Sequence, residues 1–329
     1  MDYIFFREHE PLPDKQDSPR WYAIRRAIKF AKKFDNVTYI TSGFDHYTKK
    51  KKVIPDWLLD AELSIVLVPS IGYSHNKSIF RLLNTLLYNL YSYIYLIFKK
   101  KSFVFFSGPT LGVFCLPLTP ILRHNIHSEL RDCWPLISRP KHFSIFGNLR
   151  FNLLMFFARL AYKNCSNKIS IRCTSLGVYQ FISNIISNPA RSLYRPFISE
   201  NYKSCDSIRI KKKALFAGTF EEGFDENEFE RILSEPLCRD LDITIIGYGA
   251  KSNIVEELSK NINNVTFLGK ATHSEVRRRL GETSFLLCFY PKNVGFENHR
   301  TNKIMEAESH DLKIISNIPL DTKLQVIVV

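Results

Sequence analysis

Short apolar segments alternate with longer segments of helical periodicity along most of this chain. In its first part, the apolar segments predict strands at residues 3–6, 36–42, 64–70, 102–108 and 126–130. Segment 20–34 spaces its apolar residues at helical intervals and predicts an amphipathic helix. Strands that alternate with helices are typical of an open parallel sheet, so the first part is predicted to be an α/β domain.

The same alternation starts again further along the chain. Strands are predicted at residues 212–220, 242–249, 264–270, 284–291 and 312–317, with helices at 251–260 and 273–282 among them. The alternation of strands and helices is interrupted near residues 190–205. In addition, a chain of 329 residues is longer than one compact core usually accommodates. We therefore expect two domains, residues 1–195 and 196–329. A cleft between the carboxyl ends of their sheets would bind phosphorylated ligands.

Two helical segments in the first part, 79–101 and 146–163, are unusually apolar. A membrane-spanning helix needs about 20 nearly uninterrupted apolar residues, but polar residues interrupt the first segment at Arg81, Asn84, Asn89 and Ser92. Two interpretations remain open. The helices lie at the headgroup level of a membrane, or they pack on their own domain as ordinary amphipathic helices.

Charge is distributed unevenly and bears on that choice. Residues 1–200 contain 28 Lys and Arg against 13 Asp and Glu, whereas residues 201–329 contain 18 against 19. A basic surface attracts anionic lipid headgroups or phosphate-rich polymers. Because no recognisable nucleic-acid module accompanies the charge, we predict an anionic membrane surface as partner, and no nucleic acid. Nucleic-acid binding stays an alternative that rests on charge alone.

Other patterns exclude several functional classes. The seven cysteines show neither paired nor regular spacing, so no disulfide framework or zinc site is predicted, and a cytoplasmic location is favoured. The sequence contains no GxSxG elbow, HExxH helix or P-loop. Glycines end the strands in "FAGTF" and "IIGYGA", where they would let a phosphate approach the backbone or would simply form tight turns.

The order of motifs resembles that of a known family. The segments "HSELRDCWPLIS", "ALFAGTF", "ITIIGYGA", "NVTFLGK" and "TNKIMEAESHDLKIIS" resemble those of GT-B glycosyltransferases of family 4 that build bacterial surface polysaccharides such as lipopolysaccharide O-antigen and capsule. The resemblance spans nearly the whole chain. It implies two Rossmann-like domains that face each other across a cleft. It also implies retaining transfer of a hexose or N-acetylhexosamine, without metal or cofactor, from a nucleotide-sugar to a lipid-linked saccharide at the inner face of the plasma membrane.

The resemblance also implies roles for residues near the second domain's last predicted helix. Arg300 and Lys303 would neutralise the departing diphosphate together with the helix N-terminus, and Glu306 would bind the ribose hydroxyls. Glu297 would contact the donor sugar, although eight residues separate it from Glu306 where the family has seven. Gly218 would lie against the donor. The alternatives are a solvated loop glutamate for Glu297 and an exposed helix face for Lys303 and Glu306.

In the first domain, "ELRDCWP" directly follows a predicted strand. By resemblance, Asp132 would orient a substrate hydroxyl and Arg131 would bind phosphate, the alternative being an internal Arg131–Asp132 pair. The family's glycine-rich N-terminal loop is "PLPDKQDSPRW" here, without glycine, and its Arg20 is assigned to acceptor or phosphate binding. The sequence stops about one strand after "LKIIS", so we expect a second domain that is short at its C-terminus. A non-catalytic membrane-surface relative of the family is therefore the alternative function.

Overall fold

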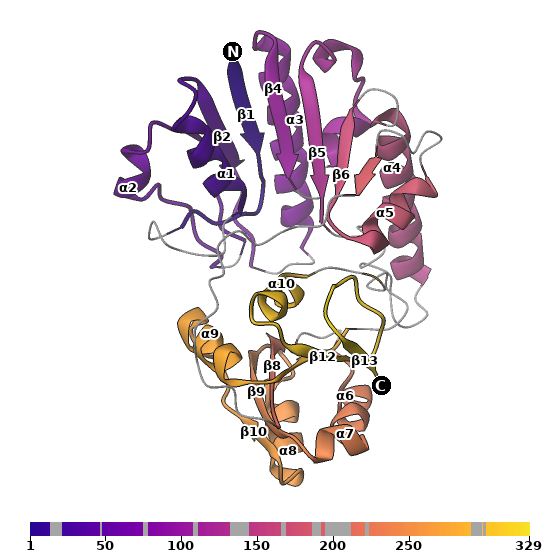
Figure 1. Ribbon diagram of the computed structural model, residues 1–329. Coiled ribbons are helices and arrows are strands. Elements are labelled where there is room, and N and C mark those ends of the chain that lie inside the picture. Colours follow the sequence, from indigo (N-terminus) through magenta and orange to yellow (C-terminus); the bar gives the residue numbers. More distant parts are fainter. Residues whose placement is uncertain are drawn as a thin grey trace. The chain divides into compact units, whose positions relative to one another are not determined.

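The computed structural model describes residues 1–13, 22–46, 48–74, 78–107, 111–131, 145–165, 169–185, 192–194, 212–220, 224–290, 298 and 301–329. The chain forms two compact units, of which the first holds strands β1–β7 and the second holds strands β8–β13 (Figure 1). The expected cleft between two facing domains, and the expected boundary at residue 195, stay predictions.

The first unit is built on a seven-stranded parallel sheet with the order β3-β2-β1-β4-β5-β6-β7. Its strands are β1 (Asp2–Phe6), β2 (Val37–Ser42), β3 (Ser64–Val68), β4 (Ser102–Ser107), β5 (Asn125–Leu130), β6 (Ser170–Cys173) and β7 (Ser192–Tyr194). β1 pairs with β2 on one side and with β4 on the other, so the winding direction reverses at β1. The carboxyl ends of strands at such a switch point are where open α/β sheets bind ligands.

Helices cover both faces of this sheet. They are α1 (Tyr22–Ala31), α2 (Asp56–Leu59), α3 (Ile79–Phe98), α4 (Ile145–Cys165), α5 (Leu176–Ser183) and the 3₁₀ helices η1 (Leu111–Cys115) and η2 (Thr119–Ile121). On one face, α1 buries Ile24 and Ala27 against Phe5 and Tyr39. α3 lies on the other face, where the Tyr88 hydroxyl donates a 2.8 Å hydrogen bond to the Ile40 carbonyl.

Helix α3 is inverted relative to an ordinary amphipathic helix. Its buried residues are mostly polar, namely Asn84, Tyr88, Asn89, Ser92 and Leu96. Its exposed large side chains are all apolar, namely Ile79, Phe80, Leu82, Leu83, Leu86, Leu87, Leu90, Ile94 and Phe98. Because water normally faces the polar stripe of a helix, an exposed apolar stripe of this length indicates a surface that contacts something other than water.

The second unit is built on a six-stranded parallel sheet with the order β10-β9-β8-β11-β12-β13. Its strands are β8 (Lys213–Thr219), β9 (Asp242–Tyr248), β10 (Val265–Phe267), β11 (Phe285–Cys288), β12 (Lys313–Ser316) and β13 (Val326–Val328). Its helices are α6 (Glu226–Leu233), α7 (Pro236–Arg239), α8 (Ser252–Asn261), α9 (His273–Glu282) and α10 (Asn302–Ser309). β8 pairs with β9 and with β11, so the switch point of this sheet lies at β8.

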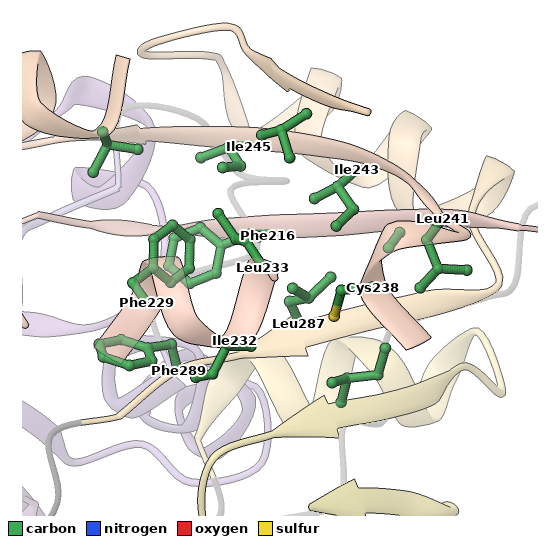
Figure 2. Packing of buried hydrophobic residues seen from close by; sticks show 14 of the residues in the cluster. Phe216, Phe229, Ile232, Leu233, Cys238, Leu241, Ile243, Ile245, Leu287 and Phe289 are labelled. Atoms are coloured by element: carbon green, nitrogen blue, oxygen red, sulfur yellow. The ribbon is translucent and has the colours of Figure 1, made fainter. Parts of the chain in front are cut away.

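Alternate residues of these strands face two separate apolar cores. Phe216 of β8 joins Phe229 of α6 and Leu287 of β11 on one face, and Figure 2 shows these side chains packed together between helix and sheet. On the opposite face, Leu215 of β8 packs with Ile304 of α10. Strands that are buried on both faces read as continuous apolar runs, which explains segments such as "ALFA" and "FLLC".

All ten predicted strands and the predicted helices at 20–34, 79–101, 146–163, 251–260 and 273–282 are confirmed in kind and approximate position. Two further strands, β6 and β7, were not predicted, and β13 lies in the segment where about one strand was expected after "LKIIS". β7 and β13 span three residues each, and β6 spans four, which is too short for a clear period. They lie at the end of their sheets, or next to it, and are identified by their pairing with a neighbouring strand.

Candidate functional site

Two of the predicted donor residues meet at the carboxyl end of β8. Gly218 pairs with Gly247 of the neighbouring strand β9. A β-carbon on Gly218 would lie 2.9 Å from Lys303 Nζ and 2.8 Å from Phe216 Cζ. These separations are too short for carbon, so a larger residue at position 218 would displace Lys303 or the Phe216 ring. Glycine therefore allows the Lys303 ammonium group to approach the strand end at the switch point.

Lys303 belongs to the first turn of α10 and is half-buried. Its Nζ lies 4.9 Å from the centroid of the Phe216 ring, within the range of a cation–π interaction. Burial lowers the pKa of Lys303 from its ordinary value, and the neighbouring Cys288 and Glu306 oppose that shift. An anion that binds beside this ammonium group would stabilise its charged form, because the anion replaces the water that the group has lost.

The two glutamates of α10 differ in their surroundings. Glu306 follows Lys303 by three residues, which places both on the same side of the helix, and it is half-buried. The Glu308 carboxylate instead accepts a 2.8 Å hydrogen bond from the Thr322 hydroxyl and a 3.3 Å bond from the Lys323 amide. Glu308 therefore holds the chain before β13, which leaves Glu306 as the carboxylate beside Lys303.

The amino end of α10 is fastened to the end of β11. The Thr301 hydroxyl lies 2.6 Å from the Tyr290 hydroxyl, and the Thr301 side chain does not cap the helix. The Asn317 side chain accepts from the Tyr290 amide at 3.0 Å and donates to the Tyr290 carbonyl at 2.7 Å. These bonds fix the direction in which the helix N-terminus, a favourable place for anions, points.

An aromatic side chain lies near the same sheet edge. Tyr248 ends β9 and is 51% exposed, with Lys270 Nζ 5.3 Å from its ring centroid. An exposed aromatic ring at a strand end was not singled out from the sequence, although "IIGYGA" contains it. Its place after an apolar strand and between two glycines is the signal that could have identified it.

In the first unit, Arg131 pairs with Glu129. Its Nε and Nη2 donate to Glu129 Oε1 at 3.1 and 3.0 Å. Two further guanidinium groups lie near the same carboxylate, with Nη1 of Arg26 at 3.7 Å and Nη1 of Arg172 at 3.6 Å from Glu129 Oε2. Sequence reasoning did not identify Glu129, Arg26 or Arg172. The latter two approach Glu129 only through the tertiary fold.

A second unpredicted cluster follows β1 at the other switch point. Lys52 is buried, and its Nζ donates to the Glu10 carbonyl at 2.8 Å and to the Thr41 hydroxyl at 2.7 Å. The Glu8 carboxylate accepts a 2.7 Å bond from the Thr85 hydroxyl. Burial raises the pKa of Glu8 to about 7, and burial lowers the pKa of Lys52 to about 8. The run "REHE" directly after a strand could have indicated this cluster.

Two histidines adjoin this cluster. The rings of His9 and His46 lie 5.0 Å apart, and His46 Nδ1 is 2.7 Å from the Tyr73 hydroxyl. Burial lowers the pKa of both imidazoles, in the case of His46 to about 4, with nearby cations such as Arg81 adding to the shift. Both rings are therefore neutral at physiological pH. The Tyr73 bond gives His46 a structural role in this cluster.

Four predicted site residues, Arg20, Asp132, Glu297 and Arg300, lie outside the described residues. Among the residues that are described, no group of three or more His, Cys, Asp or Glu side chains could hold a metal ion. In the same part of the chain, no helix is both long and apolar enough to cross a membrane.

No protein-family model matches the sequence, and no curated protein matches it either. Solved structures do resemble the fold. Sucrose-phosphate synthase from Thermosynechococcus elongatus aligns over 96% of this chain and 80% of its own, with a TM-score of 0.65 and 10% identity. WaaG, a glycosyltransferase involved in lipopolysaccharide biosynthesis, aligns over 95% and 80%, with a TM-score of 0.58 and 12% identity.

A third similar structure is that of HepE from Anabaena in complex with UDP-glucose. It aligns over 98% of this chain and 85% of its own, with a TM-score of 0.56 and 12% identity. At identities this low, the likeness concerns the fold. Together with the two parallel sheets, it establishes that the chain has the GT-B fold, with two Rossmann-like α/β domains.

Proposed function

We propose that this protein is a glycosyltransferase that moves a hexose or N-acetylhexosamine from a nucleotide-sugar to a lipid-linked saccharide, with retention of configuration and without a metal. The observation that carries the proposal is the meeting of Gly218 and Lys303 at the β8 switch point. WaaG and HepE, which share the fold, are respectively a glycosyltransferase of lipopolysaccharide biosynthesis and a protein seen in complex with UDP-glucose.

The donor site would use three features of the second unit. The Lys303 ammonium group and the amino end of α10 would stabilise the diphosphate as negative charge develops on it during departure. Glu306, one turn further along, would accept hydrogen bonds from the ribose hydroxyls. Glycine at position 218 would keep the strand end open for the phosphates.

The predicted roles of four other residues remain part of the proposal. Arg300 would add a second cation at the diphosphate, and Glu297 would contact the donor sugar. Asp132 would orient a hydroxyl group of a substrate, and Arg20 would bind the acceptor's phosphate. Arg131 was expected to bind phosphate as well. Its guanidinium group also donates two hydrogen bonds to Glu129, which would orient it for that contact.

The acceptor side would involve an apolar surface on the first unit. We define this apolar surface as the exposed side chains of α3 together with those of α4, namely Ile145, Leu149, Leu153, Phe156 and Phe157. Both helices pack against η1, so they lie on the same face of the sheet. Arg81, Arg159 and Lys163 belong to the same helices. A surface that combines exposed apolar side chains with basic ones suits an anionic bilayer.

We therefore propose attachment to the inner, cytoplasmic face of the plasma membrane through this surface. The excess of 28 basic over 13 acidic residues in positions 1–200 would add long-range attraction to anionic lipids. Attachment would bring the first unit to acceptors that are anchored in the same membrane.

A panel of UDP-, GDP- and CMP-sugars tests the donor half of the proposal. The wild-type protein should show a raised melting temperature with at least one of them. It should then transfer radiolabelled sugar from that donor to lipids of a bacterial membrane fraction. Binding without transfer would favour the non-catalytic relative, and the absence of binding to every donor would refute the proposal.

A further inference from the structure

A groove of about 340 Å³ lies on the face of the first sheet that α1 partly covers. It is lined by Phe5, Phe105, Ser107, Glu129 and Arg172 of the strands and by Arg26 of α1. Ser107 is paired with Glu129, and Glu129 with Arg172, so their side chains form one row across β4, β5 and β6. This row lies at or next to the carboxyl ends of the three strands.

The charges in this groove do not balance. Among the residues that line it, Glu129 provides one carboxylate, whereas Arg26 and Arg172 provide two guanidinium groups, and the neighbouring Arg131 already pairs with that carboxylate. Of these three arginines, only Arg131 makes hydrogen bonds to Glu129. The other two guanidinium groups stand 3.7 and 3.6 Å from its Oε2, which is too long for a hydrogen bond. Two positive charges thus remain in a place that is partly withdrawn from water.

Unpaired polar atoms gather in the same groove. Ser107 Oγ, Glu129 Oε2 and Arg172 Nε are buried and have no hydrogen-bond partner among the residues that the structure describes. Buried polar atoms in proteins almost always have a partner, so several such atoms in a single cavity are groups that a ligand, an ion or water can satisfy. Two of these three atoms belong to donor groups, a hydroxyl and a guanidinium.

The rest of the lining suits a ligand with a carbon part. Phe5 and Phe105 stack with ring centroids 4.7 Å apart, and the Arg26 guanidinium lies 4.7 Å above the Phe105 ring. This contact fixes the plane of the Arg26 fork. A fixed, planar fork of donors is the group that recognises phosphate and carboxylate oxygens best.

We propose that this groove binds a phosphate or a phosphate monoester, whose oxygens accept hydrogen bonds from Arg26, Arg172 and the Ser107 hydroxyl. Glu129 holds Arg131 in place and limits the positive charge of the empty groove. The groove belongs to the first unit, whereas Gly218, Lys303 and Glu306 belong to the second. Binding here is therefore expected whether or not the second unit binds a nucleotide-sugar.

Calorimetric titration with inorganic phosphate, pyrophosphate and glucose 1-phosphate at constant ionic strength tests this site. Wild-type protein should bind at least one of them. Arg172→Met and Arg26→Met each remove a charge-assisted hydrogen bond and should weaken binding about tenfold or more. Lys32→Met is the control, because it removes one positive charge from an exposed position of the same unit, outside the groove. It should bind phosphate as the wild type does.

Ser107→Ala tests the site even if the arginine variants fail to fold. It deletes a hydroxyl that has no partner in the described part of the chain, so the melting temperature should not change while phosphate binding weakens. The inference is overturned if the wild type binds none of the three probes. It is also overturned if the two arginine variants and Ser107→Ala bind them as well as the wild type does.

The phosphoryl group belongs either to a soluble molecule or to a lipid headgroup. A vesicle-binding experiment distinguishes these two sources. Phosphatidylcholine vesicles with and without phosphatidic acid are sedimented with wild-type and Arg172→Met protein. A loss of binding to phosphatidic acid in Arg172→Met identifies a headgroup as the source. Unchanged vesicle binding together with weakened binding of the soluble probes identifies a soluble phosphate.

Discussion

The Lys303 ammonium nitrogen lies 2.9 Å from the position that a β-carbon on Gly218 would occupy. These two residues are 85 positions apart in the sequence and meet because β8 is the central strand at which the winding of the second sheet reverses. The contact ties the identity of one residue to the placement of the other. The proposed donor site can therefore be tested by substituting either residue.

Gly218→Ala should disturb the donor site without removing any functional group. The new methyl group would collide with Phe216 and Lys303, so we expect a loss of about 1–3 kcal/mol in the free energy of unfolding. Displacement of Lys303 should also weaken nucleotide-sugar binding. Urea denaturation and thermal shift with the donor identified in the panel measure the two effects.

Gly72→Ala is the control for this substitution. Its new β-carbon would meet Phe44 at 3.4 Å, an ordinary van der Waals distance, in the other unit. This substitution should change neither the free energy of unfolding nor nucleotide-sugar binding by much. Equal donor binding by Gly218→Ala and the wild type would argue against a role of this strand end in the donor site.

Lys303→Met should separate stability from binding. Burial lowers the pKa of Lys303, which means that the charged form is less favourable in the folded protein than in the unfolded chain. Replacing it by an apolar side chain of similar length should leave the folded state as stable or more stable at neutral pH. Donor affinity should nevertheless fall about tenfold or more, because a charge-assisted contact to the diphosphate is lost.

Glu306→Gln and Glu308→Gln form a matched pair on α10. Glu306→Gln should weaken donor binding with little change in melting temperature, because the proposed role of Glu306 is to accept bonds from the ribose. Glu308→Gln should do the reverse, since Glu308 accepts bonds from Thr322 and Lys323. Weakened donor binding in Glu308→Gln alone would reverse the assignment of the two carboxylates.

Glu8 should make stability fall as the pH rises from about 4.5 to about 7. Its pKa is raised to about 7 in the folded protein, so within this range the folded state holds a proton that the unfolded chain has released. The shift corresponds to about 3 kcal/mol, an order-of-magnitude figure for this buried carboxyl group. Glu8→Gln should remove this part of the pH dependence, as measured by urea denaturation across the range.

Glu62→Gln provides the comparison for Glu8→Gln. It removes a carboxyl group from an exposed position of the same unit and should retain the wild-type slope of stability against pH. Identical slopes for wild type and Glu8→Gln would show that Glu8 does not hold its proton in the folded state.

Replacing Leu86 and Leu90 together by serine should weaken attachment to anionic vesicles. Both leucines belong to the exposed apolar surface, with 54% and 49% of their area exposed. The loss of two leucines from a lipid contact should reduce partitioning at least about tenfold. Co-sedimentation with phosphatidylglycerol-containing vesicles measures it, and the melting temperature should stay close to that of the wild type.

Leu59→Ser is the control for this prediction, because Leu59 is 64% exposed on α2, outside the apolar surface. It should bind vesicles as the wild type does. If the leucine pair bound vesicles equally well, the apolar surface would have to serve another partner.

The sequence predicted the elements of the fold well because its strands are short, apolar and separated by periodic helices. It also located α3 correctly but left open which side of the helix faces the protein. Asn84, Asn89 and Ser92 read as interruptions of an apolar segment. In the fold they face inward, where Asn84 binds the backbone of Ile71 and Asn89 accepts from the Val113 amide. Such partners depend on tertiary structure, which periodicity does not report.

The candidate site was predictable only where a motif was contiguous. Lys303 and Glu306 lie in one short segment, and the segment was recognised by its resemblance to a family. Glu129 with its surrounding arginines was missed because Arg26 and Arg172 lie 103 and 43 positions away from it. Arg131 pairs with Glu129 in the same group, and its role as a phosphate ligand stays a prediction. Neighbours in space decide the role of an arginine, and spacing along the chain does not reveal them.

Helix α3 is held on its domain by few large apolar side chains and by two hydrogen bonds, one that the Tyr88 hydroxyl donates to the Ile40 carbonyl and one that Asn89 accepts from the Val113 amide. Its outer leucines therefore contribute little to the stability of the fold, and their exposure to water is unfavourable. A variant in which polar residues replace these outer leucines should fold as the wild type does and should aggregate less at high concentration. Such a protein would allow the proposed sugar transfer to be measured in free solution, apart from any lipid.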